Sequence, residues 1–265
     1  MRLSRRALGL LATASIARPA HAAEPTFDAL LARYTSRPAD GVARVDYARW
    51  KANAADFAAL EGWIAEVATR RPSAMPRNAA FAYWANLYNA LTLKLILERY
   101  PVRSIKDIRS SGVGLDPRQF SGPWRTRLVT VEGRRMSLDD IEHETMRPTF
   151  QDPRVHYAVN CASIGCPDLP LRTWRAEGLE ADLDAAARTF VNHPRGALVL
   201  PDGRLRVSSI YKWFREDFGG DDAGVIAHLR RHAAPALAEG LRNVTRVAED
   251  AYDWALNDLN PAARS

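Results

Sequence analysis

The central helix of this 265-residue chain is predicted at Asn78-Ala-Ala-Phe-Ala-Tyr-Trp-Ala-Asn-Leu-Tyr-Asn-Ala-Leu-Thr-Leu-Lys-Leu-Ile-Leu-Glu-Arg-Tyr100. It runs for roughly six helical turns without a proline or glycine, and Pro101 ends it. Large apolar residues lie nearly all round it: Phe81, Tyr83, Trp84, Leu87, Leu91, Leu93, Leu95 and Ile96. A helix that is apolar on every side is expected in the middle of a domain, surrounded by other elements.

Polar residues interrupt this helix at Asn86, Tyr88 and Asn89. Asn86 and Asn89 are three residues apart and therefore share a face. A buried carboxamide needs hydrogen-bond partners, and two arrangements would supply them. The side chains can bond to neighbouring loops, or they can face a pocket and bind a ligand. The sequence leaves both open.

Around this helix the chain alternates amphipathic helices with short strands joined by turn signals such as Glu132-Gly133 and Pro201-Asp202-Gly203. No linker-like change of composition follows Ala23. We therefore expect one α+β domain over residues 24–265, with the long helix packed on a small, mostly antiparallel sheet. The segment Arg109–Pro123 is rich in glycine and proline and is predicted to be a loop.

The first 22 residues are predicted to be a cleavable signal peptide of the twin-arginine type. Arg5-Arg6 precedes a short apolar stretch, and Ala20-His21-Ala22 has the small-x-small pattern of a cleavage site. We therefore expect a periplasmic or secreted protein. Without this segment, 33 basic residues stand against 31 acidic ones and the net charge falls from +6 to +2. That balance argues against nucleic acid as a partner, and no later stretch is apolar enough for an integral membrane span.

Both cysteines of the chain lie in the segment Asp152–Pro170, which also places His156 and Asn160 in an apolar run. A cysteine nucleophile needs a base nearby and a group that orients the base. Cys161, His156 and either Asn160 or Glu142 can supply these roles. His156 and Asn160 are four residues apart and share a face of a helix or a strand, whereas Cys161 meets His156 only if the chain turns.

A structural disulfide between Cys161 and Cys166 is the alternative, because an exported protein can bridge cysteines at this spacing. We predict no metal site, since a Cys-x-x-x-x-Cys spacing is loose for zinc and no second cysteine pair completes it. No cofactor is assigned. Trp213, Phe214 and Trp254 are expected in the core, and Lys212, Arg215, Glu216 and Asp217 on a solvated face.

Several separated motifs resemble the family catalogued as domain of unknown function 547, over about Phe81 to Asn257. They are Trp84–Leu91, Ser137–His143, His156–Pro167, Tyr211–Phe218 and Tyr252–Asn257. The resemblance implies no settled activity. A long helix followed by a mostly β region, with a histidine on a strand, is also similar to papain and transglutaminases. Those enzymes carry their cysteine at the start of the central helix, where this chain has none.

Two functions remain open at this stage. One is a thiol-dependent hydrolase or acyl transferase that uses Cys161 and His156. The other is a non-catalytic periplasmic domain that binds a small molecule, a peptide or a cell-wall fragment, with Asn86, Tyr88 and Asn89 among the ligand-binding residues and a Cys161–Cys166 disulfide holding the fold.

Overall fold

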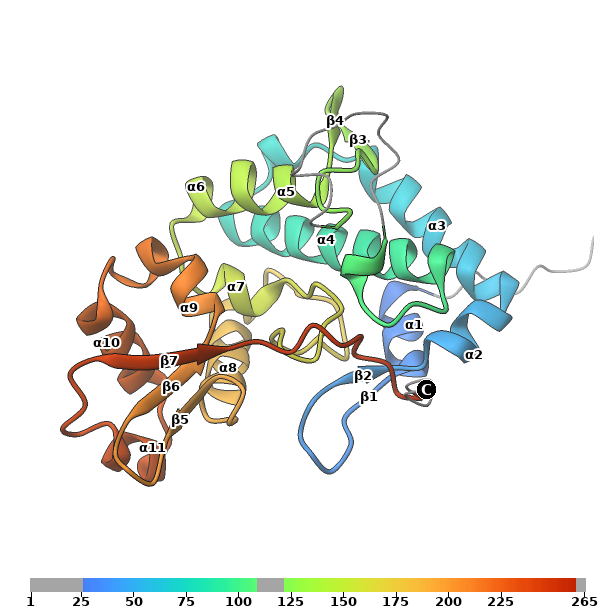
Figure 1. The fold of residues 1–265 in the computed structure, drawn as a ribbon. Coiled ribbons are helices and arrows are strands. Elements are labelled where there is room, and N and C mark those ends of the chain that lie inside the picture. Colours follow the sequence, from blue (N-terminus) through green and yellow to red (C-terminus); the bar gives the residue numbers. More distant parts are fainter. Residues whose placement is uncertain (1–25, 109–121, 261–265) are drawn as a thin grey trace, which may run out of the picture.

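A computed structural model describes residues 26–108 and 122–260 (Figure 1). The expected signal peptide and most of the expected loop over residues 109–123 lie outside the described residues. The described chain is α+β, as predicted. The first half, up to the phenylalanine that closes α6, contains these elements: α1 (Phe27–Tyr34), β1 (Thr35–Ser36), β2 (Arg44–Val45), α2 (Tyr47–Ala52), α3 (Ala54–Ala68), η1 (Pro72–Ala74), α4 (Arg77–Arg99), η2 (Ile105–Asp107), β3 (Val129–Val131), β4 (Arg134–Met136), α5 (Leu138–Ile141), the π-helix η4 (Glu142–Met146) and α6 (Arg147–Phe150).

The second half begins with one short helix and then holds the largest sheet. Its elements are α7 (Val155–Ala158), α8 (Leu179–Val191), β5 (Ala197–Val199), β6 (Leu205–Ser208), α9 (Ile210–Trp213), the 3₁₀ helix η5 (Arg215–Phe218), α10 (Asp222–His232), α11 (Pro235–Gly240) and β7 (Val247–Ala251). The histidine expected on a strand, His156, therefore lies on a helix. A proline at its start and an extended Val159 at its end limit α7 to one turn.

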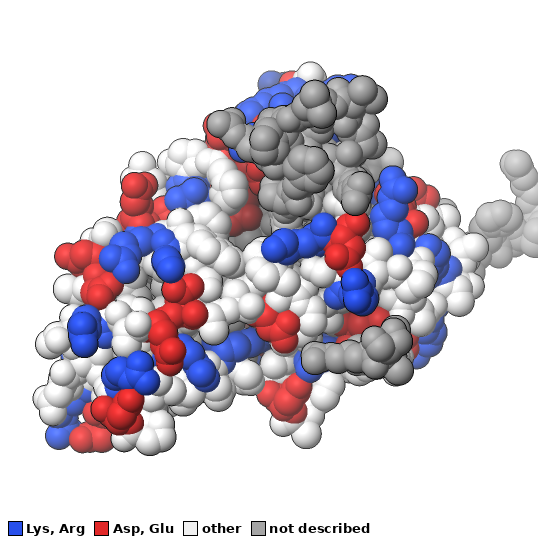
Figure 2. All heavy atoms as spheres, in the orientation of Figure 1, with Lys and Arg blue, Asp and Glu red and all other residues white. Residues whose placement is uncertain are grey.

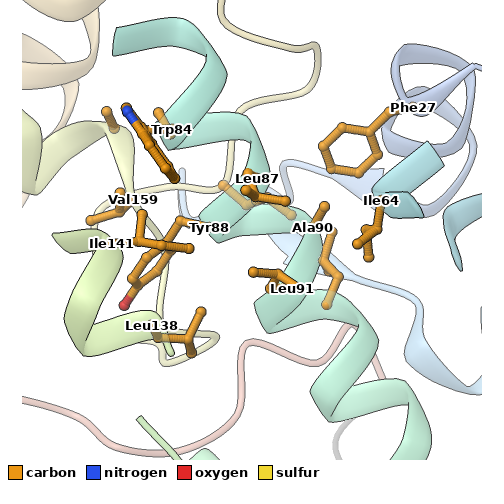
Figure 3. Packing of buried hydrophobic residues seen from close by; sticks show 14 of the residues in the cluster. Phe27, Ile64, Trp84, Leu87, Tyr88, Ala90, Leu91, Leu138, Ile141 and Val159 are labelled. Atoms are coloured by element: carbon orange, nitrogen blue, oxygen red, sulfur yellow. The ribbon is translucent and has the colours of Figure 1, made fainter. Parts of the chain in front are cut away.

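The predicted central helix is α4, and sixteen of its residues are buried, in a continuous block broken only by Lys94. Its neighbours are helices rather than a sheet: α2, α3 and α5 pack against it. Figure 3 shows Leu87, Ala90 and Leu91 of α4 with Phe27 and Ile64 on one side, and Tyr88 beside Leu138 and Ile141 of α5 on the other. The long helix is thus enclosed by helical layers, which explains its nearly all-round apolar surface.

The strands within residues 26–108 and 122–260 form three small sheets instead of one. β1 pairs with β2 and β3 with β4, both antiparallel. In the third sheet the order is β5-β6-β7, with β5 antiparallel and β7 parallel to β6. A second apolar cluster lies under this sheet, between α8, α9 and α10. The turn signals Glu132-Gly133 and Pro201-Asp202-Gly203 located the β3–β4 and β5–β6 pairs, but the sequence did not predict that the strands form separate sheets.

The segment after β7 joins the two halves. It crosses the front of the molecule in Figure 1 towards β1 and β2. Along the way Ile164 N–H donates to the Ala255 carbonyl at 2.8 Å, and Gly165 N–H donates to the Asp253 carbonyl at 2.8 Å. A Cβ on Gly165 would lie 2.7 Å from the Asp253 nitrogen, so only glycine permits this approach. The contact places Tyr252 and Trp254 beside residues 159–167, the segment that carries both cysteines and that we call the cysteine loop.

The helical stretch that starts with α5 continues past Pro148, although a proline usually ends a helix. The π-helix η4 continues it, and α6 carries Pro148 in its first turn. A proline lacks the N–H group that a regular α-helix requires, but the hydrogen-bond ladder is already interrupted by the π turn directly before it. Glu142 and His143 lie in this π turn, and such turns frequently occur at functional sites.

Candidate functional site

A pocket of about 580 Å³ lies between the α4–α5 layer and the segments around α9 and the end of β7. Its lining includes five of the predicted site residues: Tyr88, Glu142, His156, Cys161 and Cys166. Asn86, Asn89 and Asn160 are buried elsewhere, and their side chains do not line it. The pocket is therefore assembled from α4, η4, α7, the cysteine loop and the C-terminal half of the chain.

His156 is held between two carboxylates on the pocket wall. Its Nε2 lies 2.7 Å from Asp217 Oδ2, and its Nδ1 lies 3.5 Å from Glu142 Oε1. Arg147 forms a double hydrogen bond to Asp217, at 2.6 and 3.1 Å. The His156 ring is 3% exposed and stacks on Phe214 with the centroids 4.3 Å apart. We call Glu142, Arg147, His156 and Asp217 the ionic network.

The basic and acidic groups of the ionic network stabilise one another in their charged forms. Burial lowers the pKa of His156, but hydrogen bonds to Asp217 and Glu142 outweigh burial and raise it above its ordinary value. Burial raises the pKa of Glu142, but His156 and the nearby His143 hold it below its usual range. Burial likewise opposes ionisation of Asp217, and His156 and Arg147 outweigh it and lower the pKa. An imidazolium between two carboxylates is therefore the favoured state.

Asp217 was expected on a solvated face, and this prediction is wrong. Its carboxylate contacts His156 and Arg147, and its side chain is 24% exposed. The 3₁₀ turn η5, which follows α9, directs it inward. The sequence showed only a weak signal: Asp217 is one of two acidic residues, with Glu216, between the aromatic positions Phe214 and Phe218, both of which contact His156.

Cys161 and Cys166 are both free thiols, with the sulfur atoms 3.3 Å apart. A bonded pair would lie about 2.0 Å apart, so the structure does not show the disulfide considered from the sequence. Cys161 Sγ also lies 3.0 Å from the Tyr252 hydroxyl and 3.6 Å from Ser163 Oγ. Cys161 is half-buried and Cys166 is buried, and both belong to the lining of the pocket.

The two thiols differ in acidity. The hydrogen bond with Cys166 lowers the pKa of Cys161 against the effect of burial, and Tyr252 adds to this, so the value falls to about 7. Burial raises the pKa of Cys166 well above its ordinary value. The structure therefore pairs one thiol that ionises near neutral pH with one that stays protonated.

The cysteine loop is held by carboxamides. Asn89 Nδ2 donates to the Ala158 carbonyl at 2.9 Å, and Asn89 Oδ1 accepts from Asn160 N–H at 2.8 Å. Asn160 Oδ1 accepts from Ala162 N–H at 2.8 Å, and its Nδ2 donates to the Pro167 carbonyl at 2.7 Å. Asn160 thus contacts the backbone rather than His156.

Asn86 acts in the same way one turn earlier on α4. Its side chain forms a pair of hydrogen bonds, each 2.9 Å long, with the backbone N–H and carbonyl of Trp174. We call Asn86, Asn89 and Asn160 the amide network. All three are buried. Of the two arrangements that the sequence left open for the helix asparagines, the structure places them against neighbouring loops.

One wall of the pocket is aromatic. Trp213, Tyr252 and Trp254 contact one another at centroid distances of 4.6 to 5.5 Å, and Trp124 extends the row 5.7 Å from Trp254. Lys106 Nζ lies 5.0 Å from the Trp254 ring. Trp213 is 47% exposed, so its assignment to the core is wrong. It is positioned by the end of α9 and by the chain after β7, which sequence spacing alone does not bring together.

Histidine and carboxylate groups also occupy the opposite rim. His143 Nε2 lies 3.9 Å from Asp139 Oδ1, and Arg125 Nε donates to Asp139 at 3.2 Å. Nδ1 of His143 is buried and has no hydrogen-bond partner in the described part of the chain. In the same residues, no hydrogen bond joins His156 to Cys161. Within residues 26–108 and 122–260, no group of three or more His, Cys, Asp and Glu side chains is arranged to hold a metal ion.

The distribution of surface charge and the hydropathy of the helices give information on possible partners. Basic and acidic side chains are interspersed over the visible face in Figure 2, as the near-balanced charge suggested. Among the helices that the structure describes, none has the length and hydropathy needed to cross a bilayer.

Comparison with known proteins gives one match. The family model described as "Protein of unknown function, DUF547" matches residues 72–191. This range contains α4, the π-helix and the cysteine loop, and it ends before Asp217 and the aromatic pair Tyr252 and Trp254. No curated protein and no solved structure matches the chain.

Proposed function

This chain belongs to the DUF547 family through residues 72–191, and we propose that its pocket is the active site of a thiol-dependent hydrolase or acyl transferase. Cys161 is the proposed nucleophile. The observation that carries the proposal is the position of its sulfur: it faces a 580 Å³ pocket and lies within hydrogen-bond distance of Cys166, Tyr252 and Ser163. A thiolate held by donors at the wall of a pocket is the reactive form of cysteine.

The backbone around Cys161 supports this role. The next residue, Ala162, has a φ of 63°, in the left-handed region that residues other than glycine rarely adopt. Asn160 stabilises this turn through its hydrogen bond to Ala162 N–H. Strained residues of this kind persist where the surroundings over-determine them, and they gather at active sites. The turn presents the Cys161 side chain to the pocket.

The proposed reaction is acyl transfer. The Cys161 thiolate attacks the carbonyl carbon of an ester, thioester or amide, a C–S bond forms, and the bond to the leaving group breaks. Water or an acceptor nucleophile then attacks the thioester, its proton passes to the neutral His143, the C–S bond breaks, and the thiolate is released. The leaving group takes a proton from His143 in this proposal. His143 is preferred over His156 because Asp217 and Glu142 face both ring nitrogens of His156.

The aromatic wall suggests where the remainder of the substrate binds. Trp213, Tyr252 and Trp254 offer ring faces on the open side of the pocket, next to the cation of Lys106. Aromatic rings with a few placed polar groups are typical of sites that bury most of a small ligand.

The proposal is tested with a panel of aryl esters and aryl thioesters. We expect Cys161→Ala to reduce turnover by about a hundredfold or more, with an acyl adduct on Cys161 detectable by mass spectrometry in the wild type. The matched control is Ser163→Ala, which removes another hydroxyl contact of the sulfur and should retain most of the activity. Equal turnover by wild type and Cys161→Ala would refute a thiol mechanism.

A non-catalytic binding domain is the second candidate. One observation favours it: the ionic network satisfies both nitrogens of His156, which a structural role explains without chemistry. The ligand would be a small molecule, a peptide or a cell-wall fragment. A Cys161 thiol that reacts no faster than free cysteine at pH 7, together with unchanged ligand binding in Cys161→Ala, would favour this function over acyl transfer.

Export through the twin-arginine route remains part of the proposal. It rests on Arg5-Arg6 and the short apolar stretch after them. Replacing both arginines with lysine should keep the protein in the cytoplasmic fraction. Undiminished appearance in the periplasmic fraction would exclude dependence on this route.

A further inference from the structure

The geometry of the cysteine loop points to a chemistry that acyl transfer does not need. An acyl-transfer nucleophile requires one thiol, but the structure places the sulfur of a second thiol, Cys166, 3.3 Å from Cys161 Sγ. The N–H group of Cys161 also points to Cys166 Sγ at 3.2 Å. Cys166 is buried and has no other evident role in the pocket. The chain contains no further cysteine.

We propose that Cys161 and Cys166 form a reversible redox pair, in which Cys161 reduces hydroperoxides and Cys166 resolves the product as an intramolecular disulfide. The pair is a peroxide-reactive site and a site of oxidative modification. The proposal does not depend on acyl transfer, because it requires only that the Cys161 sulfur is accessible and that Cys166 reaches it.

The first step consumes one hydroperoxide. The Cys161 thiolate attacks the distal oxygen, an S–O bond forms, the O–O bond breaks, and the alkoxide or hydroxide that leaves takes a proton from water. Sulfur is oxidised to a sulfenic acid and the peroxide is reduced to an alcohol or water. Tyr252 supports this step, since its hydroxyl is 3.0 Å from the sulfur, and burial raises the pKa of Tyr252 so that it remains a hydrogen-bond donor.

The second step joins the two sulfurs. The Cys166 sulfur attacks the Cys161 sulfenic acid, an S–S bond forms, and the thiol proton leaves with the hydroxyl group as water. The cycle closes when a small dithiol reduces the disulfide by thiol exchange and is itself oxidised. The asymmetry of the two thiols matches these roles: Cys161 is the accessible and more acidic one, and Cys166 stays protonated until the sulfenic acid forms.

The loop is already built for closure. Asn160 ties its two ends together by accepting from Ala162 N–H and donating to the Pro167 carbonyl. Bringing the sulfurs from 3.3 Å to a bond of about 2.0 Å therefore needs a small side-chain movement rather than closure of a free loop. Because the loop is short and already ordered, the bridge is expected to add little stability, which suits a bond that must open again.

The experiment treats reduced full-length mature protein with an equimolar amount of hydrogen peroxide. Samples are quenched with a thiol-blocking maleimide and analysed as intact masses and peptide maps. We expect loss of two hydrogen atoms, a peptide linking Cys161 to Cys166, and full recovery with dithiothreitol. Addition of two or three oxygen atoms to Cys161, or two thiols that stay blockable by maleimide, would overturn the proposal.

Two single substitutions separate the roles. Cys166→Ser should still react with peroxide but should accumulate sulfenic acid, trapped by dimedone, and then irreversibly oxidised forms. Cys161→Ser should resist equimolar peroxide, because the remaining thiol is buried. Faster oxidation of Cys161→Ser than of Cys166→Ser would reverse the assignment and refute it. If either variant fails to fold, the time course of the wild type decides: the sulfenic acid on Cys161 must precede the disulfide.

Acyl transfer and the redox pair fail independently. Loss of turnover in Cys161→Ala without disulfide formation in the wild type would leave acyl transfer in place and remove the redox pair. Disulfide formation without turnover of any ester or thioester would do the opposite.

Discussion

Asn89 and His156 are both buried polar residues of the same region, yet they are satisfied in different ways. Asn89 bonds to two neutral backbone groups, the Ala158 carbonyl and the Asn160 N–H, and makes no contact with a charge. His156 bonds to the carboxylates of Asp217 and Glu142 and lies at the pocket. The amide network connects α4 to the cysteine loop, whereas the ionic network connects η4 and α7 to η5.

We infer from this difference that the amide network stabilises the fold, whereas the ionic network shapes the pocket. Amides do not titrate, so the amide network should contribute the same stability at every pH. The ionic network consists of groups whose pKa values are shifted by one another, and its contribution must change with pH. Substitutions in each network test this division, and two substitutions in the aromatic wall test the pocket, in order from the largest expected effect to the smallest.

Replacing Asn89 with alanine should cost about 2–6 kcal/mol, because two buried backbone groups lose their partners at about 1–3 kcal/mol each. The loss should be the same at pH 6 and pH 9. Thr92→Val is the matched control on α4: Thr92 is buried, its hydroxyl has no partner in the described residues, and its removal should be neutral or stabilising. Chemical denaturation measures both. A loss at Asn89 no larger than that at Thr92 would contradict a supporting role for the amide network.

His156→Gln should show a pH-dependent loss of about 1–2 kcal/mol. The folded pKa of His156 is raised, so its stabilising contribution is complete below the ordinary value of 6.5 and disappears as the pH rises through the folded value. The difference between wild type and variant should therefore be largest near pH 6 and shrink towards alkaline pH. The depressed pKa values of Glu142 and Asp217 act at the acid end, where stability is lost as pH falls through them. A difference that stays constant with pH would remove the distinction between the two networks.

Tyr252→Phe should change the reactivity of the pocket with little effect on the fold. It removes the hydroxyl 3.0 Å from Cys161 Sγ, so the pKa of Cys161 should rise from about 7 and the rate of iodoacetamide alkylation at neutral pH should fall. We expect a decrease of about two- to threefold, since a rise of about half a pKa unit lowers the thiolate fraction near pH 7 by about that factor. An unchanged pH profile would show that Tyr252 does not support the thiolate.

Trp213→Ala should have the smallest effect on stability, within about 0.5–1 kcal/mol, because the side chain is 47% exposed. Its effect on ester or thioester turnover should be larger than its effect on unfolding, as expected for a pocket wall. A melting temperature that falls as far as that of Asn89→Ala would show that Trp213 belongs to the core after all.

The sequence alone was sufficient to predict the features that depend on residues close to one another along the chain. The continuous apolar surface of residues 78–100 predicted a buried central helix, and the turn signals at Glu132-Gly133 and Pro201-Asp202-Gly203 located two strand pairs. Capping by Ser137 was also predictable, since its hydroxyl accepts from Asp140 N–H. Cys161 and His156 were recognisable as candidates because polar groups stand out in the apolar run that contains them, and Glu142 was a candidate only as a group that could orient the base.

Tertiary structure decided what these residues touch. Asp217 lies 61 positions after His156 in the chain, and Tyr252 lies 91 positions after Cys161. Asp217 meets His156 because of the turn of η5, and Tyr252 meets Cys161 because residues 252–254 closely approach Gly165. Local sequence periodicity gives little indication of either feature. The physical reason is that periodicity reports the polarity of the side on which a residue lies, whereas the partner of a polar group is set by three-dimensional packing. The same sequence pattern, a buried polar side chain, thus became a backbone support at Asn89 and part of a charged pocket wall at His156.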